Sequence, residues 1–469
     1  MATREGNPDL PIKKTSMKRL LLLLCLPLLC YTQTFSQRSD STIIRYLQQE
    51  YDIPFSTNNR VVVFKTGQEK FDDLFAAVRQ ARHSIHLEYF NFRNDSISGA
   101  LFDLLAAKAA EGVEVRALFD GFGNSSNDRP LRRHHVDSLR RRGIEIHEFD
   151  PLRFPWINHA FHRDHRKIVV IDGVIAYTGG MNVADYYING KPEFGEWRDI
   201  HLRIEGEAVA GLQGVFLNFW NQVTEQEVQG PEYYPGTRPA DRLFTGLRPD
   251  TSNCAGEKHV GVVDRTPGVT PKIMHDTFLH AIDGAQDEVL IISPYLTLCR
   301  HLKKSLKRAS KRGVKVKIMV SAKSDIPITP RIVEYNVHQL MQAGAEIYFF
   351  EGGFHHSKIM MVDSAYAFVG SANLNNRSLS FDYECNLLIA DSCTTRQLCD
   401  IFYHDVENSC FRLTPERWQE MPWRKRFLGW LFHFLSPFTL NDSGTEGKRL
   451  RTKPSEGDPY DAARLGILV

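Results

Sequence analysis

A short polar pattern occurs twice in this chain with the same internal spacing. In each copy a histidine is followed by a lysine two residues later and by an aspartate seven residues later. The two copies consist of His165, Lys167 and Asp172, and of His356, Lys358 and Asp363. They lie 191 residues apart (356 − 165), far more than the roughly 20–50 residues of a solenoid repeat. The chain is therefore predicted to contain two similar units that pack against each other.

The similarity continues beyond the aspartates. A turn of small residues containing Gly180 leads to Asn182 in the first copy, and one containing Ser371 leads to Asn373 in the second. Histidine and asparagine are 17 residues apart in both copies (182 − 165 and 373 − 356). We expect these four residues to lie at the substrate, because amides and hydroxyls supply oriented hydrogen bonds.

Strand and helix patterns alternate on either side of the motif. Residues 61–64, 84–90 and 113–119 have strand patterns, and 71–78 and 97–105 have helical spacing. Gly112 and Gly313 begin similar stretches 201 residues apart (313 − 112). Such alternation favours α/β layers. The predicted fold is two tandem α/β sandwich domains, related by a pseudo-twofold axis, that share one site at their interface.

Shifts in composition suggest the domain limits. Residues 229–257 are rich in glycine and proline and suit a linker, and residues 441–469 are polar and predict a disordered tail. The remaining segments are a leader at 1–37, a first domain at 55–228, a second domain at 258–410 and an amphipathic membrane-associating segment at 411–440.

The leader has basic residues before an apolar run that starts at Leu20. That run is shorter than the roughly 20 residues of a membrane span, so the leader is interpreted as a signal peptide, with a short uncleaved anchor as the alternative. Of the eight cysteines, the six outside the apolar run have no zinc-ligand spacing, and an exported domain could form a disulfide bond. We accordingly expect a bacterial envelope protein at the cytoplasmic membrane, with exported catalytic domains.

Net charge does little to select a partner. The formal charge of +2 is nearly neutral for 469 residues, so the overall field does not call for nucleic acid. Basic runs within 132–142 and 303–308 are interpreted as solvated helix faces. A nucleic-acid partner is therefore not favoured, and the oligomeric state is left open.

The repeated residue types suit phosphodiester chemistry. Alternate residues of a strand face the same side, so each histidine is expected to project beside its lysine. Two lysines can neutralise the phosphate oxygens and two asparagines can orient them. One histidine can attack phosphorus and the other can protonate the leaving oxygen. This scheme requires neither a metal ion nor a cofactor.

An imidazole in such a role is usually oriented by a carboxylate. Asp199 follows His165 by 34 residues and Glu384 follows His356 by 28, each in an expected strand. We predict that each acid orients the histidine of its own copy, with surface strand acids as the alternative. Asp172 and Asp363, although part of the repeated signature, are expected to serve turns and ion pairs.

Together these motifs resemble the phospholipase D superfamily, and more narrowly its bacterial cardiolipin synthases. The resemblance covers roughly residues 55–440 and includes 88–90, 182–187, 197–199, 323–327 and 370–378. It implies that His165 is the nucleophile and His356 the acid/base. Such synthases often begin with two membrane helices, whereas this chain has one short apolar run. His159 and His162 are expected at a loop or at the substrate's edge.

The segment at 411–440 favours a lipid substrate. Trp423 and Trp430 flank a basic stretch at 424–426 within an aromatic, apolar sequence, as in segments at bilayer interfaces. The alternative is a helix packed on the core. The resemblance implies transesterification of phosphatidylglycerol to cardiolipin. Lipid hydrolysis, an exported nuclease and a non-catalytic membrane scaffold remain alternatives.

Overall fold

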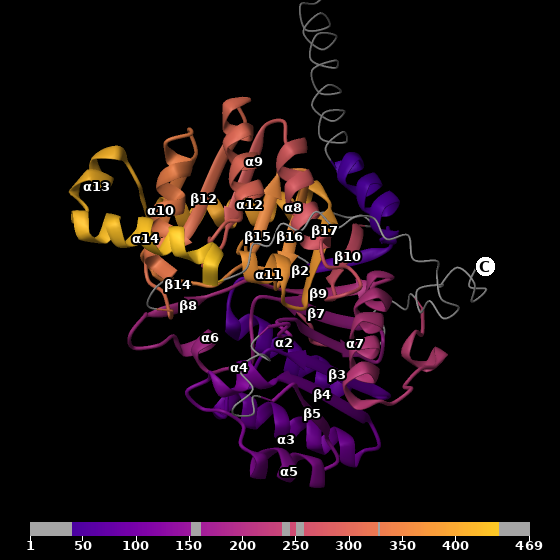
Figure 1. The fold of residues 1–469 in the computed structure, drawn as a ribbon. Coiled ribbons are helices and arrows are strands. Elements are labelled where there is room, and N and C mark those ends of the chain that lie inside the picture. The colour runs from indigo at the N-terminus through magenta and orange to yellow at the C-terminus, as the bar shows by residue number, and fades with distance from the viewer. Residues whose placement is uncertain (1–39, 152–160, 237–243, 250–257, 327–328, 440–469) are drawn as a thin grey trace, which may run out of the picture.

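The computed structural model describes residues 40–151, 161–236, 244–249, 258–326 and 329–439. It contains two large mixed sheets, one in each half of the chain (Figure 1). The leader at 1–37, the tail at 441–469, His159 and most of the 151–158 stretch lie outside the described residues.

The first sheet has seven strands in the order β2-β9-β7-β6-β3-β4-β5. These strands are β2 (Asn59–Phe64), β3 (Ser84–Tyr89), β4 (Glu114–Asp120), β5 (Glu145–Phe149), β6 (Lys167–Ile171), β7 (Ile175–Gly179) and β9 (His201–Gly206). The helices of this half are α2 (Gly67–Gln80), α3 (Ser96–Ala110), α4 (Gly121–Ser125), α5 (Arg133–Arg141), α6 (Tyr186–Asn189), α7 (Ala208–Thr224) and the short η2 (Pro231–Tyr233).

The second sheet has nine strands in the order β1-β10-β17-β16-β15-β11-β12-β13-β18. These are β1 (Phe55–Ser56), β10 (His259–Arg265), β11 (Glu288–Ile292), β12 (Lys315–Ser321), β13 (Glu346–Phe350), β15 (Ile359–Val362), β16 (Tyr366–Gly370), β17 (Glu384–Ala390) and β18 (Cys410–Arg412). The helices here are α8 (Ile273–Gly284), α9 (Arg300–Lys311), α10 (Thr329–Met341), α11 (Asn376–Ser380), α12 (Ser392–Ser409), α13 (Pro415–Glu420) and α14 (Trp423–Thr439).

The seven inner strands of the second sheet repeat the order of the first. In both sheets three neighbouring strands run parallel, β3-β4-β5 and β11-β12-β13, and the rest pair antiparallel. Parallel neighbours need crossover connections, which α3 and α9 supply. This equivalence confirms the predicted fold of two similar α/β units.

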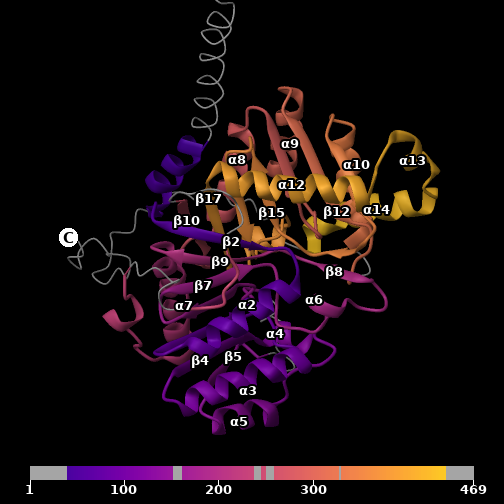
Figure 2. The ribbon, with the colours of Figure 1, turned by 180° about the vertical axis from the view of Figure 1, so that it is seen from behind.

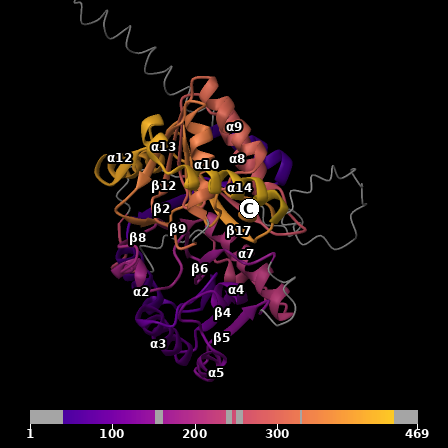
Figure 3. The same cartoon turned by 60° about the vertical axis from the view of Figure 1, so that its left-hand side comes forward.

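One apolar core belongs to both halves. It joins Val61 and Leu202 of the first sheet to Leu290 and Val369 of the second, with side chains from α7 and α12. Each sheet has a further core on its outer side. In the first half it lies beneath α2, α3 and α5, and in the second half beneath α8, α9 and α10. The halves thus stack through their sheets, as seen from front, back and side (Figures 1, 2 and 3).

A third, two-stranded sheet ties the halves together near the motifs. It pairs β8 (Glu196–Arg198) in parallel with β14 (Gly353–His355). The sequence predicts that Asp199 lies within a strand, but Asp199 and Ile200 form a break between β8 and β9. The prediction was wrong because β8 pairs with the other half of the molecule.

The connection between the sheets is partly anchored. Tyr233 and Phe244 are both buried against the first half.

None of the helices in the described parts of the chain is long and apolar enough to cross a membrane.

Candidate active site

Each motif histidine stands just before a strand of its own sheet and is held by the other half. His165 precedes β6, and its backbone N–H donates to the Tyr383 carbonyl at 3.0 Å. His356 lies between β14 and β15, and its backbone N–H donates to the Arg198 carbonyl at 2.7 Å. These two contacts are equivalent under the pseudo-twofold axis, so both histidines are fixed at the seam between the halves.

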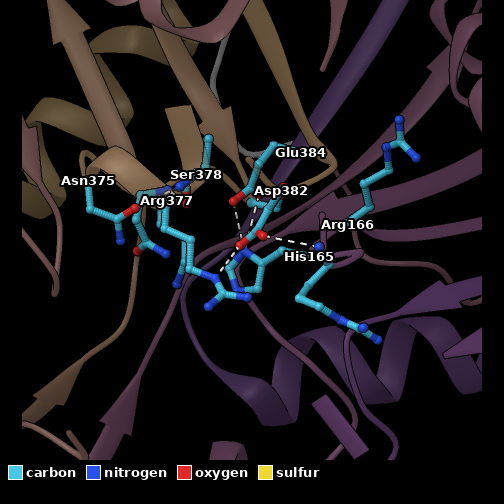
Figure 4. A network of polar contacts seen from close by, with 12 residues as sticks. His165, Arg166, Asn375, Arg377, Ser378, Asp382 and Glu384 are labelled. Carbon is cyan, nitrogen blue, oxygen red and sulfur yellow. Dashed lines mark hydrogen bonds and ion pairs between the residues drawn. The ribbon is translucent and has the colours of Figure 1, made fainter. Parts of the chain in front are cut away.

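The carboxylates are exchanged between the halves. Nδ1 of His165 lies 3.1 Å from Oε1 of Glu384, and Nδ1 of His356 lies 2.8 Å from Oδ2 of Asp199. Figure 4 shows Glu384 facing His165. Our prediction that each acid serves its own copy was wrong. Because each histidine bonds the residue just before the opposite acid, it meets the acid of the other half.

Gly180 and Ser371 support these carboxylates. The Ser371 hydroxyl donates to Glu384. A Cβ atom at Gly180 would lie 2.3 Å from Oδ1 of Asp199, so only glycine fits there. We had expected both residues to bind substrate, but neither lines the pocket. The structure places them behind the acids instead, because the turns that carry them pack against the strands bearing Asp199 and Glu384.

The two lysines are buried beside the histidines. Lys167 donates to the His165 carbonyl, and Nζ of Lys358 lies 3.0 Å from Nε2 of His356. Burial lowers the pKa of Lys167 to about 7 and that of Lys358 to about 8, although nearby carboxylates oppose the shift. A bound phosphodiester anion would favour the charged ammonium groups and so reverse this shift.

Asn182 and Asn373 line the pocket that contains both histidines. Each is almost fully buried, and its Oδ1 atom has no hydrogen-bond partner within the described residues. An unpaired buried amide is costly. The Oδ1 atoms could accept a hydrogen bond from a substrate hydroxyl, whereas contact with a phosphate oxygen would use the amide N–H groups of the same side chains.

Asp172 and Asp363 lie away from the pocket, in turns after β6 and β15. Each has positive φ, 54° and 52°. Each carboxylate accepts bonds from three consecutive backbone N–H groups at the start of a neighbouring strand. The donors are Arg82, His83 and Ser84 for Asp172, and Gln286, Asp287 and Glu288 for Asp363. Their surroundings match the expected turn role, and no ion pair to either is found within the described residues.

Both histidines line one open pocket of about 1460 Å³. Typical small-molecule sites measure roughly 300–1,000 Å³, so this pocket has room for more than one headgroup. Its lining includes apolar side chains from the second half, namely Leu298, Ile326, Ile332 and Phe432. No group of histidines, cysteines and carboxylates suited to a metal ion occurs in the described parts of the chain.

The two sides of the pocket differ. On the His165 side, Arg377 pairs with Asp382 at 2.7 Å (Figure 4). The position that corresponds to Arg377 in the first copy is Tyr186 (377 − 191), and it lies on the His356 side against Trp197. A search for repeated residues cannot find such differences. The resemblance had pointed to the stretch containing Arg377, without a role.

The charged groups around the two histidines also differ, and they affect the two histidine pKa values differently. Burial, Lys167, Lys358 and Arg377 all lower the pKa of His165 well below its usual value. Burial and Lys358 also lower the pKa of His356, to about 4, but Asp199 opposes the shift. Burial raises the pKa of Asp199, yet Lys358 and His356 outweigh it and hold the carboxyl ionised. An ionised Asp199 favours a proton on His356.

His162 contacts Phe381 of the other half. It has a φ of 61°, and its Nδ1 is 2.9 Å from the carbonyl of Phe381. It does not line the pocket.

Comparison with known proteins agrees with this geometry. The family described as "Cardiolipin synthase, PLD-like domain" matches residues 74–195 and 278–406, once in each half. A cardiolipin synthase of Halalkalibacterium halodurans is 33% identical over 386 residues, covering 82% of this chain and 73% of that protein. Cardiolipin synthase 2 of Staphylococcus epidermidis is 35% identical over 383 residues, covering 81% and 75%.

Among solved structures, a phosphatidylserine synthase of Haemophilus influenzae superposes with a TM-score of 0.62 at 15% identity, covering 86% of this chain and 98% of that one. That likeness concerns the fold alone. With two family matches placed on the two halves, and relatives similar over most of their length, the chain belongs to the cardiolipin synthase family of phospholipase D-like proteins.

Proposed function

We propose that the protein is a phosphatidyltransferase that makes cardiolipin from two molecules of phosphatidylglycerol. The observation that carries this proposal is the pair of buried histidines in one pocket, each held by a carboxylate from the opposite half. Family membership adds the lipid substrate class, since the relatives are named cardiolipin synthases.

In the first step Nε2 of His165 attacks phosphorus, while Glu384 holds the proton on Nδ1. The bond from phosphorus to the glycerol oxygen breaks, and His356 gives that oxygen a proton. Glycerol leaves and the phosphatidyl group stays on His165 as a phosphohistidine. Lys167, Lys358 and the two asparagines stabilise the charge that develops on the phosphate oxygens.

In the second step His356 takes the proton from a hydroxyl of a second phosphatidylglycerol. The oxygen attacks phosphorus, the phosphorus–nitrogen bond breaks and His165 is restored. The balance is two phosphatidylglycerol molecules in, one cardiolipin and one glycerol out. Asp199 supports this role, because a carboxylate on Nδ1 stabilises the imidazolium form of His356.

Water in place of the second lipid would give phosphatidic acid, so a phospholipase D reaction uses the same groups. The size of the pocket and the apolar side chains in its lining favour a second lipid. A nuclease is less well supported, because the basic helix α5 lies at the end of the molecule opposite α9 (Figures 1 and 2). The two basic runs therefore do not form one strand path.

Membrane association is part of the proposal. Helix α14 packs on α10 at Gly429, where an added Cβ would lie 2.7 Å from the Arg331 carbonyl. Other positions of the helix expose large apolar side chains, namely Trp423, Phe427, Leu428 and Trp430. Basic residues 424–426 adjoin them, which suits anionic headgroups. Since Phe432 of the same helix lines the pocket, a bilayer at α14 would deliver lipid directly to the site.

Export of the catalytic halves is a further part. Cys393, at the start of α12, is disulfide-bonded. Disulfide bonds persist in oxidising compartments and are rare in the cytosol of most bacteria. Peptide mapping under non-reducing conditions should show Cys393 protected from alkylation, and alkylation of Cys393 in protein from intact cells would contradict export.

The function is tested with purified protein and phosphatidylglycerol vesicles, with products identified by mass spectrometry. Cardiolipin and glycerol in equal amounts are expected. Phosphatidic acid alone would favour hydrolysis, and cleavage of added DNA without any lipid product would overturn the proposal. His165→Ala should abolish product formation in each case.

A further inference from the structure

The wall of the pocket beside His356 holds a carboxylate outside the repeated signature. Asp325 lies in the loop after β12 and lines the pocket together with Tyr295 and His356. The Tyr295 hydroxyl donates to Oδ1 of Asp325 at 2.6 Å. Within the described residues, the Asp325 carboxylate has no other hydrogen-bond partner. The Tyr295 ring stands edge-on to His356, with centroids 6.1 Å apart.

Asp325 is not a remnant of the duplication. The strand β12 corresponds to β4 with an offset of 201, so Asp325 corresponds to Asn124 (325 − 201). Asn124 is buried and uses its amide twice on the backbone of Leu131. The second half therefore has a carboxylate facing the pocket where the first half has an internal structural amide.

A carboxylate here is poorly suited to the phosphate itself, because two anions repel each other. Hydroxyl groups or an ammonium group are better partners. Lys191 argues against an ammonium group, since its Nζ lies over the rings of Tyr186 and Trp197, 4.7 and 5.3 Å from their centroids, in the same pocket. A neutral polyhydroxyl group meets neither objection.

The two half-reactions place the alcohol on this side. The leaving glycerol takes its proton from His356, and the incoming hydroxyl gives its proton to the same ring. By microscopic reversibility both alcohols occupy one place, next to His356 and away from His165. Burial and Asp325 raise the pKa of Tyr295, so its hydroxyl keeps its proton and orients the carboxylate.

We propose that Asp325, held by Tyr295, is the specificity-determining residue for the glycerol headgroup, accepting hydrogen bonds from the hydroxyl that does not react. This rests on the proposed phosphatidyl transfer and adds to it the recognition of the alcohol. The subsite selects an alcohol with a neighbouring hydroxyl over one without. Sites built to bond a substrate hydroxyl discriminate strongly against analogues that lack it.

The test uses a phospholipid whose headgroup is p-nitrophenol, because that leaving group makes no use of the glycerol subsite. Vesicles of this donor are given to the protein with equal concentrations of glycerol, 1-propanol and ethanolamine. Nitrophenolate release measures the first half-reaction, and mass spectrometry measures how the phosphatidyl group divides among the acceptors. The variants are Asp325→Asn, Asp325→Ala and Tyr295→Phe. The matched control is Asp128→Asn, which removes a pocket carboxylate that Arg93 already engages at 2.7 Å.

The unaltered protein should prefer glycerol to 1-propanol, and both Asp325 variants should lose about tenfold or more of that preference, as expected for a hydrogen bond to a charged group. Tyr295→Phe should lose less, and the control should keep the preference. Nitrophenolate release should stay within about twofold throughout, since the reacting groups are intact.

Three results would overturn the inference. The Asp325 variants could keep the full preference for glycerol. They could lose transfer to all three acceptors in the same proportion while nitrophenolate release is kept, which would mean that Asp325 acts through His356 and not on the alcohol. The unaltered protein could prefer ethanolamine, which would make this an ammonium subsite. No nitrophenolate release from the unaltered protein would instead count against the proposed function.

Discussion

At the scale of single residues, the two histidines are alike in sequence and different in surroundings. Arg377 adds positive charge near His165, whereas Asp199 supports a proton on His356. The signature could be identified from spacing alone, and so could the two acids as candidates. Which acid meets which histidine could not, because that depends on contacts between residues 157 and 219 positions apart.

The division of roles predicts different responses to the leaving group. Nitrophenol leaves without an acid, so His356→Ala should still release one equivalent of nitrophenolate from the p-nitrophenyl lipid and then stall as phosphohistidine. His165→Ala should release none. Rapid-quench kinetics and mass spectrometry of the intact protein measure both. A burst in His165→Ala and none in His356→Ala would reverse the assignment.

Exchange of the acids between the halves makes a second prediction. Glu384→Gln should slow the nitrophenolate burst by up to about 10,000-fold, the loss seen when the carboxylate partner of the catalytic histidine in a Ser-His-Asp triad is neutralised. Asp199→Asn should leave the burst nearly unchanged and slow only turnover of phosphatidylglycerol, whose glycerol needs an acid. Asp405→Asn is a suitable control, because this buried carboxylate pairs with Arg198 and His355 outside the pocket. If Asp199→Asn slowed the burst and Glu384→Gln slowed only turnover, each acid would be serving the histidine of its own copy.

At the scale of elements, most strands follow from local pattern. The stretch predicted at 113–119 is β4 at Glu114–Asp120, and the helical spacing at 71–78 lies within α2. The failure at Asp199 was of another kind. No local signal ends a strand there, since the break results from parallel pairing of β8 with β14, which lies in the other half.

Helix α14 supplies the prediction at this scale. Replacing Trp423 and Trp430 together by serine should weaken binding to vesicles containing phosphatidylglycerol by about tenfold or more, because each buried aromatic contributes on the order of 1.5–3 kcal/mol. Vesicle sedimentation measures it. The control Tyr234→Ser, which replaces an exposed aromatic residue elsewhere on the molecule, should bind the vesicles normally. The double variant should also turn over a short-chain soluble substrate at the normal rate. Unchanged sedimentation of the double variant would contradict membrane binding through α14.

At the scale of the whole molecule, burial of histidines at the seam and in the sheets makes stability depend on pH. Burial lowers the pKa of His86 to about 3, and it lowers those of His165, His201 and His356 as well. The unfolded chain therefore binds more protons than the folded one below the ordinary histidine pKa of about 6.5. The contribution of these histidines to stability should be greatest above that pH and should fall as the pH drops from about 6.5 toward the folded values.

Each such histidine contributes up to about 1.4 kcal/mol per pH unit to the free energy of unfolding. His86 stacks on Phe216 at 4.6 Å, so His86→Phe should keep the packing and reduce the slope between pH 6 and 5 by about that amount. Urea unfolding at several pH values measures the slope. The exposed His83 gives the control His83→Phe, which should not change it. An unaltered slope in His86→Phe would show that His86 is not kept neutral by folding.

The crossed carboxylates also bear on how such a chain can arise. A free first half would carry His165 without Glu384, and a free second half would carry His356 without Asp199. An ancestor with a single copy could work only as two identical subunits, each lending its acid to the other. Joining them in one polypeptide released the paired positions from identity, as Gly180 and Ser371 now illustrate. Division of labour, one side for the phosphoryl group and the other for the alcohol, is open only to the fused form.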